Sequence, residues 1–369
     1  MKLNPNLKVK KIEMGLKIIE QSAQVSDSFK NYKKWFGLND SLIEKNVCLV
    51  LVTNLRDLID SNILRNELDY QKIILYCVDM DWVAKQEDVD IIVNGLNDIF
   101  GNNIDKVFLS LTSISWNRDW KNIQTRNGIG FLSMVLDRSI QLGKKYDLVK
   151  LEREKHFTTM QNEPRPIRIY LYDYLIKNNF LDKFEYSFFS AHTKDILTWE
   201  DRIGGDDGLY PIDGEFRKAR SFEKEEVGNK QYDFQISNFN AELNGYFSIF
   251  METNYMNGGI YYGFSEKSFK GFALKKPFML WASPAAPKGL TEMGFKLYDK
   301  IFDIELMFDT AHDMRTIRFF DDLKRICDLP INQIRNMYID NLETIEYNHS
   351  NLIRLIEKEK TDLINLIKE

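Results

Sequence analysis

Two neighbouring stretches in the second half of the chain decide the fold that we expect: FSEKSFK at residues 264–270 and KPFMLW at residues 276–281. The first is typical of a helix that begins with a polar Ser-Glu-Lys, and the second is typical of a buried β-strand. The helix start would hold the carboxylate of Glu266 and the ammonium of Lys267. At that place they could bind the hydroxyls of a ribose and offset the charge of a pyrophosphate.

Short apolar runs alternate with helical patterns along both halves of the chain. This alternation predicts β-α-β units, because consecutive parallel strands need a crossover between them. Strands are expected at residues 47–52, 73–78, 107–111, 157–160, 186–190, 247–251 and 277–281, and a further strand is expected to end at Phe302-Asp303. Helices are expected at residues 55–67, 87–100, 130–143, 167–178, 268–274 and 290–293.

We therefore expect an α/β fold with two Rossmann-like domains that face a cleft. The first domain is expected at residues 1–150 and the second at residues 151–330, followed by a helical tail at residues 331–369 that packs back on the first domain. The tail is charged and has a helical period. Its candidate buried positions are Ile345, Leu352, Leu355, Ile356, Leu363 and Leu366.

Composition argues against several classes of protein. The chain has three cysteines without a C-x-x-C pair and four isolated histidines, so neither a disulfide scaffold nor a metal site is predicted. The formal net charge of −5 gives no global basic field that would gather a polyanion. Residues 1–11 are polar and basic, so we expect no signal peptide and no membrane span, and a cytoplasmic location.

Charged residues that follow predicted strands of the second half are candidate ligand contacts, because doubly wound sheets bind ligands beyond the carboxyl ends of their strands. NEPRPIR at residues 162–168 places Arg168 in the first turn of a helix, where a cation is disfavoured unless an anion is bound. Glu252 ends another strand. The same residues also fit a surface arginine paired with Asp173 or Glu163, and Ser265 as an ordinary helix cap.

The first half offers weaker candidates. Asp79 and Asp81 form a D-x-D after the strand at 73–78, a pattern that can hold a divalent ion and that capping aspartates also produce. Asp119 lies between Trp116 and Trp120, whose rings could stack on a sugar or a base, or pack in the core. No G-x-x-x-x-G-K-[ST], strand-following G-x-G-x-x-G or G-x-S-x-G motif supports a P-loop, dehydrogenase or α/β-hydrolase assignment.

Several blocks of the second half, in order, resemble the donor domain of fucosyltransferase-like glycosyltransferases of the B-type fold, similar to members from viruses and bacteria. Residues 162–175 resemble its opening strand, Asn162, turn and Arg168, and residues 250–267 resemble its glycine- and tyrosine-rich loop with Thr-Glu-Lys, here Ser265-Glu266-Lys267. Residues 277–284 and 294–303 also fit. The likeness covers roughly residues 157–309, and the first half shows none.

The resemblance implies an inverting transferase that needs no metal or cofactor and takes its sugar from a GDP- or UDP-linked donor. Arg168 and Lys267 would hold the diphosphate, Glu266 the ribose, and Glu252 would face the donor sugar. The further donor-pocket residues implied are Asn162, Arg165, Tyr262 and Ser265. The acceptor hydroxyl of a glycan, a protein or a hydroxymethylated DNA base would bind the first domain, with Asp79, Asp81 or Asp119 as base.

Two other readings stay open at this point. Asp79 and Asp81 could serve a metal-dependent transferase of the A-type fold. Alternatively, the chain could be a non-catalytic protein with a degenerate transferase fold that binds a nucleotide or a partner.

Overall fold

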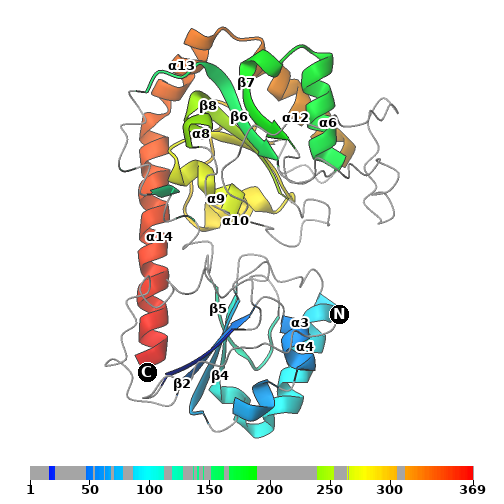
Figure 1. Cartoon of the computed structure of the whole chain (residues 1–369), viewed down its shortest axis with the longest axis vertical. Helices are drawn as coiled ribbons and strands as arrows, with labels where there is room; N and C mark the ends of the chain where they lie inside the picture. The colour runs from blue at the N-terminus through cyan, green and yellow to red at the C-terminus, as the bar shows by residue number, and fades with distance from the viewer. Residues whose placement is uncertain are drawn as a thin grey trace. The chain divides into compact units, whose positions relative to one another are not determined.

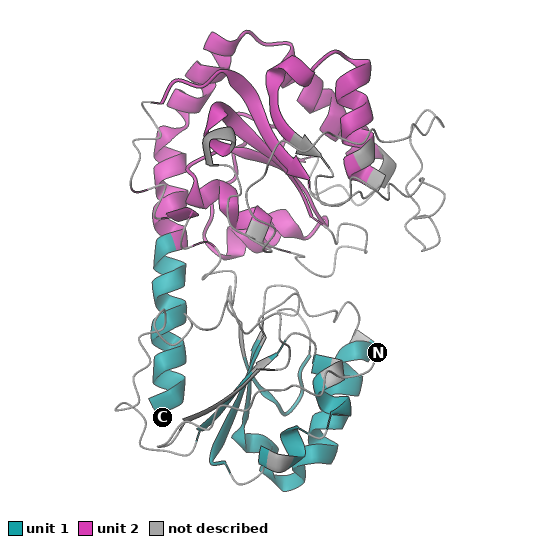
Figure 2. Cartoon of the chain, viewed as in Figure 1, with its two compact units in different colours: residues 1–135, 353–369 teal, residues 136–352 magenta. Residues whose placement is uncertain are grey.

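The computed structural model divides into two compact units, residues 1–135 with 353–369 and residues 136–352 (Figure 2). The division therefore falls between Val135 and Leu136 and again inside the last helix. The described residues are 16–20, 47–52, 55–61, 63–67, 70–77, 86–111, 119–127, 136, 139–140, 144, 151–161, 166–188, 239–252, 264, 266–305 and 312–368.

The first unit contains a parallel sheet whose described strands follow one another in chain order (Figure 1). Its strands are β1 (Leu16–Glu20), β2 (Val47–Val52), β3 (Lys72–Cys77), β4 (Val107–Leu111) and β5 (Gln124–Asn127). The predicted bounds of β2 and β4 are confirmed, and β3 is shifted by one residue. The sequence analysis missed β1 and the polar β5, which forms by pairing with β4.

The two faces of the first sheet are covered by different parts of the chain. Cys48, Val50, Ile73 and Leu75 pack in one core with residues of α3 (Leu55–Asp60) and α4 (Gln86–Phe100). Short 3₁₀ helices, η2 (Leu64–Glu67) and η3 (Gly101–Lys106), follow them. On the opposite face, the hydroxyl of Tyr76 donates to Glu359 at 3.4 Å and Nζ of Lys72 donates to the Leu366 carbonyl at 2.9 Å. Residues 353–369 therefore complete the first unit.

The second unit contains a parallel sheet whose strands do not follow one another in chain order. Its strands are β6 (Lys155–Gln161), β7 (Phe184–Phe188), β8 (Gly245–Met251) and β9 (Phe278–Trp281), in the order β7-β6-β8-β9. The chain moves from β6 to β7 in one direction and continues beyond β6 in the other, so the order reverses between β6 and β8. Such a reversal is the point where doubly wound sheets bind ligands.

Helices cover both faces of the second sheet. They are α6 (Pro166–Lys177), α8 (Phe239–Asn244), α9 (Glu266–Ala273), α10 (Ala286–Glu292), α12 (His312–Cys327), α13 (Ile331–Asp340) and α14 (Leu342–Lys368), with the 3₁₀ helix η5 (Leu181–Lys183). Figure 1 shows α6 and α12 side by side, and the Tyr170 and Phe320 rings meet at 4.7 Å. On the other face, Phe272 of α9 packs on Phe278 of β9 at 5.0 Å.

Helix α14 contributes to both units. Its first part is fixed to the second unit, where the amide of Asn348 makes hydrogen bonds to both backbone groups of Lys296, at 2.8 Å each. Of the predicted buried positions in the tail, Ile345, Leu352, Ile356 and Leu363 are buried as expected, whereas Leu355 and Leu366 are partly exposed. Among the described helices, none combines the length and the apolar composition that a membrane span requires.

One predicted strand is wrong. Phe302 lies in a bend and Asp303 in irregular backbone, and the Phe302 ring packs against Phe247 of β8 at 5.3 Å. The apolar residues of this segment are buried because they cover the sheet. Their sequence pattern therefore resembles that of a strand, although the segment pairs with none of the described strands. The sequence analysis also missed α12, which carries Phe319 and Phe320 over the face shared with α6.

Candidate functional site

The carboxyl end of the second sheet is the candidate site, and the strand ends of β6 and β8 lie at its centre. Helices α6 and α9 begin near these strand ends, since α6 follows β6 in the chain and α9 follows β8. Phe278 faces α9 whereas Trp281 faces Phe319 of α12, so α9 and α12 lie on opposite faces. The sheet therefore directs helix N-termini from both faces toward one end, which suits an anion.

Arg168 is the third residue of α6 and is almost fully buried, with 3% of its surface exposed. Its Nη2 donates to the Met251 carbonyl at 2.8 Å, so the first turn of α6 is bonded to the last residue of β8. The prediction that Arg168 opens a helix is confirmed. The alternative of an exposed surface arginine is wrong, because the guanidinium lies against the strand end.

Glu252 follows β8 and joins that strand end to α9. Its backbone N–H donates to the Trp281 carbonyl at 2.8 Å, and its Oε1 accepts from the Ser268 hydroxyl at 2.6 Å. Only 1% of the Glu252 surface is exposed. Because Ser268 lies in the first turn of α9, the carboxylate is held at the positive end of that helix.

Lys267 is half-buried and adjacent to Ser268, and Glu266 is the first residue of α9. Arg168 donates to the Met251 carbonyl, and Ser268, which follows Lys267, donates to Glu252. Met251 and Glu252 are consecutive residues at the end of β8. The structure therefore brings the first turns of α6 and α9, which carry Arg168 and Lys267, to the end of β8.

The sequence analysis missed two residues at this end of the sheet. Arg315 lies in the first turn of α12, is 3% exposed, and has its guanidinium carbon 4.8 Å from the ring centroid of Trp281, the last residue of β9. The signal available in the sequence was the one that identified Arg168, an arginine at a helix start. It was not read because α12 itself was not predicted.

Gln161 ends β6 and is 1% exposed. Its Nε2 donates to the Thr159 hydroxyl at 3.0 Å, whereas its Oε1 has no hydrogen-bond partner among the described residues. A buried acceptor of this kind is unusual in folded proteins, where such atoms are normally satisfied by protein, water or a ligand.

We expected Asp119 to lie beyond a strand end, because it follows the strand at residues 107–111, but the structure places it before another strand. It precedes β5 and lies at the amino end of the first sheet, where its Oδ1 accepts from the Lys121 backbone N–H at 2.9 Å in an Asx turn. Trp120 is buried in the core beside α4, so its ring packs there and is not available for stacking on a sugar. The sequence analysis did not predict β5. Because β5 is parallel to β4, the turn that precedes it lies at the amino end of the sheet.

The other predicted site residues lie outside the described residues: Asp79, Asp81, Asn162, Arg165, Tyr262 and Ser265. Within the described part of the chain, no group of three His, Cys, Asp or Glu side chains could hold a metal ion.

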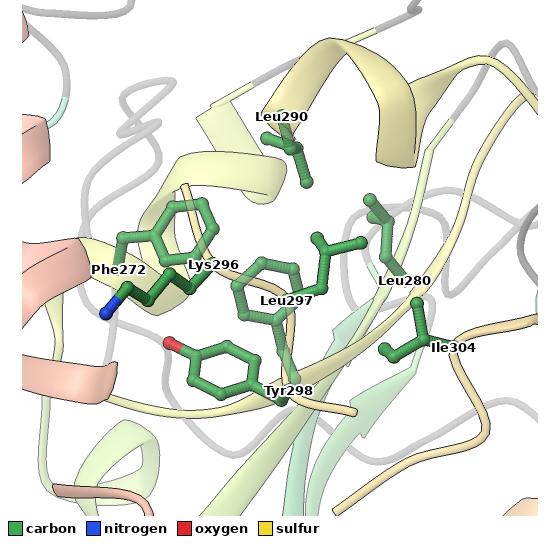
Figure 3. A pocket seen from close by; sticks show the side chains of 8 residues that line it. Phe272, Leu280, Leu290, Lys296, Leu297, Tyr298 and Ile304 are labelled. Atoms are coloured by element: carbon green, nitrogen blue, oxygen red, sulfur yellow. The ribbon is translucent and has the colours of Figure 1, made fainter. Parts of the chain in front are cut away.

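An apolar pocket lies on the face of β9 that packs against α9, and residues of α9, α10 and β9 line it (Figure 3). Its lining residues include Phe272, Leu280, Leu290, Leu297 and Tyr298. The space barely admits one water molecule, and its lining is almost entirely apolar, so we regard it as a packing defect of the core.

A second cluster of buried charge lies at the amino end of the same sheet. Lys276 is fully buried, and its Nζ donates to the Thr158 hydroxyl at 2.9 Å and to the Glu242 carbonyl at 2.6 Å. The Glu242 carboxylate pairs with Lys270. Burial holds the pKa of Lys276 well below its ordinary value. These bonds join α8, α9 and β6 at the end of the sheet opposite to the candidate site.

Comparisons with models of protein families, with curated proteins and with solved structures find no match for this chain.

Proposed function

We propose that the chain is an inverting, metal-independent glycosyltransferase that moves a sugar from a nucleoside diphosphate onto an acceptor hydroxyl. The observation that carries the proposal is the reversal of strand order between β6 and β8, with Arg168, Glu252 and Ser268 at those strand ends. The resemblance of residues 157–309 to fucosyltransferase-like donor domains supports the same assignment.

In this proposal, the nucleoside diphosphate binds at the carboxyl end of the second sheet. Arg168 and Lys267 offset the negative charge that builds on the diphosphate as it departs, which lowers the barrier to transfer. Glu266 at the start of α9 accepts hydrogen bonds from the ribose hydroxyls. The Glu252–Ser268 hydrogen bond holds α9 against the end of β8. Glu252 therefore positions the helix that carries Glu266 and Lys267.

The acceptor oxygen attacks the anomeric carbon from the face opposite the departing diphosphate, so the configuration inverts. A carboxylate takes the hydroxyl proton during this step. Asp79 and Asp81 are the candidates for this base. The acceptor is a glycan, a protein or a hydroxymethylated DNA base. A DNA base would have to be extruded from the duplex to be reached.

Thermal unfolding with a panel of nucleoside diphosphates tests the donor site. At a ligand concentration a hundred times Kd, the wild type should gain about 5–10 °C with GDP or UDP. Lys267→Ala removes one cation and Arg168→Lys removes the planar fork, so both variants should lose most of this shift. Lys288→Ala is the matched control, because it removes a cation from an exposed position in the same unit.

Equal shifts in the wild type and in both site variants would overturn the site assignment. Transfer assays with the responding sugar nucleotide then test the chemistry. Activity that disappears with a chelator and returns with Mn²⁺ would contradict the metal-independent mechanism and would favour the A-type alternative based on Asp79 and Asp81.

A further inference from the structure

A second buried arginine lies beside the next strand end, and we infer that Arg315 acts with Arg168 as a two-arginine clamp for the diphosphate of the ligand. This inference rests on the proposed function, because it assigns the diphosphate to the same end of the same sheet. It adds a residue on α12, a segment to which the sequence analysis gave no role.

The two guanidinium groups approach neighbouring strand ends. Arg168 bonds to the Met251 carbonyl of β8, and Arg315 lies over the Trp281 ring of β9. Met251 and Trp281 are register partners, so their backbones are about 5 Å apart, the usual spacing of paired strands. The two arginines therefore contact adjacent residues at the end of the sheet.

Both arginines also come from the same face of the sheet. The Tyr174 ring of α6 meets the Phe320 ring of α12 at 4.7 Å, and Phe319 of α12 meets Trp281 at 5.4 Å. Helices α6 and α12 are thus neighbours on one face, and each presents an arginine in its first turn. A diphosphate has two phosphate groups joined by one oxygen, which matches two forked donors side by side.

Helix stability does not explain this placement. A cation in the first turn of a helix faces the positive end of the helix dipole, and burial removes water from a charge that water stabilises well. Both disadvantages apply to Arg168 in a helix of 12 residues and to Arg315 in a helix of 16 residues. Contacts with the Met251 carbonyl and the Trp281 ring offset part of the second, and a bound anion would reverse the first.

Gln161 provides an independent observation at the same place. Strand register puts Gln161 on the same face as Met251 and Trp281, because Phe157 pairs with Phe247 and side chains alternate along both strands. Its buried Oε1 lacks a donor among the described residues. A ligand hydroxyl or a water molecule bound with the ligand would supply that donor.

Calorimetric titration of the full chain with inorganic pyrophosphate, GDP and UDP tests the clamp. Arg315→Gln should weaken binding of pyrophosphate and of the preferred nucleoside diphosphate by about 10- to 100-fold, the usual effect of losing charged hydrogen bonds. Arg318→Gln is the matched control. Arg318 is one turn further along α12 and pairs with Asp303 at 2.7 Å, so this variant loses the same charge and should bind like the wild type.

Arg315→Lys keeps a cation near Trp281 and serves as the second variant if Arg315→Gln does not fold. It should unfold near the wild-type temperature and bind pyrophosphate several-fold more weakly, because it lacks the planar fork. Wild-type affinity for pyrophosphate in Arg315→Lys, or in a folded Arg315→Gln, would overturn the clamp.

The outcomes separate this inference from the proposed function. Nucleoside diphosphate binding that is unchanged by Arg315→Gln overturns the clamp and leaves the proposed function standing. Pyrophosphate binding that depends on Arg315, without any gain from an attached nucleoside, supports the clamp and overturns nucleotide recognition. No binding of any of the three ligands to the wild type overturns both.

Discussion

Buried charged residues of the second unit occur at both ends of its sheet. At the carboxyl end, Arg168, Glu252 and Arg315 are buried beside strand ends and helix starts. At the amino end, Lys276 bonds to Thr158 and to Glu242 inside the protein. Because burial also lowers the pKa of Lys276, the stability of the second unit should depend on pH.

Stability should rise with pH through the action of Lys276. Burial lowers the pKa of Lys276 in the folded state well below the ordinary value of 10.5, while the unfolded chain keeps that ordinary value. Between the two pKa values the unfolded state binds more protons, so the free energy of unfolding increases as the pH rises toward 10.5. The slope is at most about 1.4 kcal/mol per pH unit.

Urea unfolding of the wild type and of Lys276→Met at several pH values between 6 and 9 checks this prediction. The difference between the two free energies should grow with pH. Its slope is the readout, because Lys276→Met also removes two hydrogen bonds and changes the absolute stability. Lys300→Met removes a charge from an exposed position and controls for charge loss as such. A difference that does not vary with pH would contradict the assignment.

At the scale of elements, close approach of backbones restricts which residues can begin a strand. A Cβ added to Gly245, the first residue of β8, would lie 2.5 Å from the Phe157 carbonyl carbon and 2.6 Å from the Thr158 nitrogen. These atoms belong to the backbone of β6, which cannot move without breaking the β6–β8 pairing. Gly95 in α4 also lacks space, but its nearest neighbour is the Cγ2 methyl of the Ile59 side chain, at 2.4 Å.

Gly245→Ala should therefore destabilise the protein more than Gly95→Ala does. We expect Gly245→Ala to cost about 3 kcal/mol or more, at the upper end of what overpacking costs. Gly95→Ala should cost less, because it displaces a side chain where Gly245→Ala displaces backbone, and because alanine stabilises a helix interior by about 1 kcal/mol relative to glycine. The midpoints of urea unfolding measure both effects. Equal losses would show that the β6–β8 pairing yields as readily as a side chain.

At the scale of the whole molecule, the two units share one helix and have separate cores. Leu352 and Leu363 of α14 are both completely buried, yet Leu352 belongs to the second unit and Leu363 to the first. Substitutions at these two positions change the same residue type in the same helix. They therefore separate the contribution of α14 to one unit from its contribution to the other.

Leu363→Ala should destabilise mainly the first unit and Leu352→Ala mainly the second, by about 2–5 kcal/mol each. Hydrogen exchange resolved by peptide checks this. Protection should fall in β2 and β3 for Leu363→Ala, and in β8 for Leu352→Ala. The same loss of protection in both sheets for either variant would show that the two units unfold as one.

Local patterns predicted much of the fold. The apolar runs that became β2, β4, β8 and β9 are visible within four to seven residues each, and the helical period located α4 and α6. The sequence also placed Arg168 at a helix start and Glu252 at a strand end, because both facts follow from nearby residues. It could not indicate that Arg168 is buried against Met251, since that contact joins residues 83 positions apart.

The amino-acid sequence by itself determined the α/β class, most strands and the charged residues near their ends, because alternation and apolar runs act over a few neighbouring positions. The tertiary structure alone decided the strand order, the reversal between β6 and β8, the polar β5 and the stacking of Arg315 on Trp281. Each of these depends on pairing or packing between segments far apart in the chain. Such a contact depends on both segments, so the sequence of either one alone does not predict it.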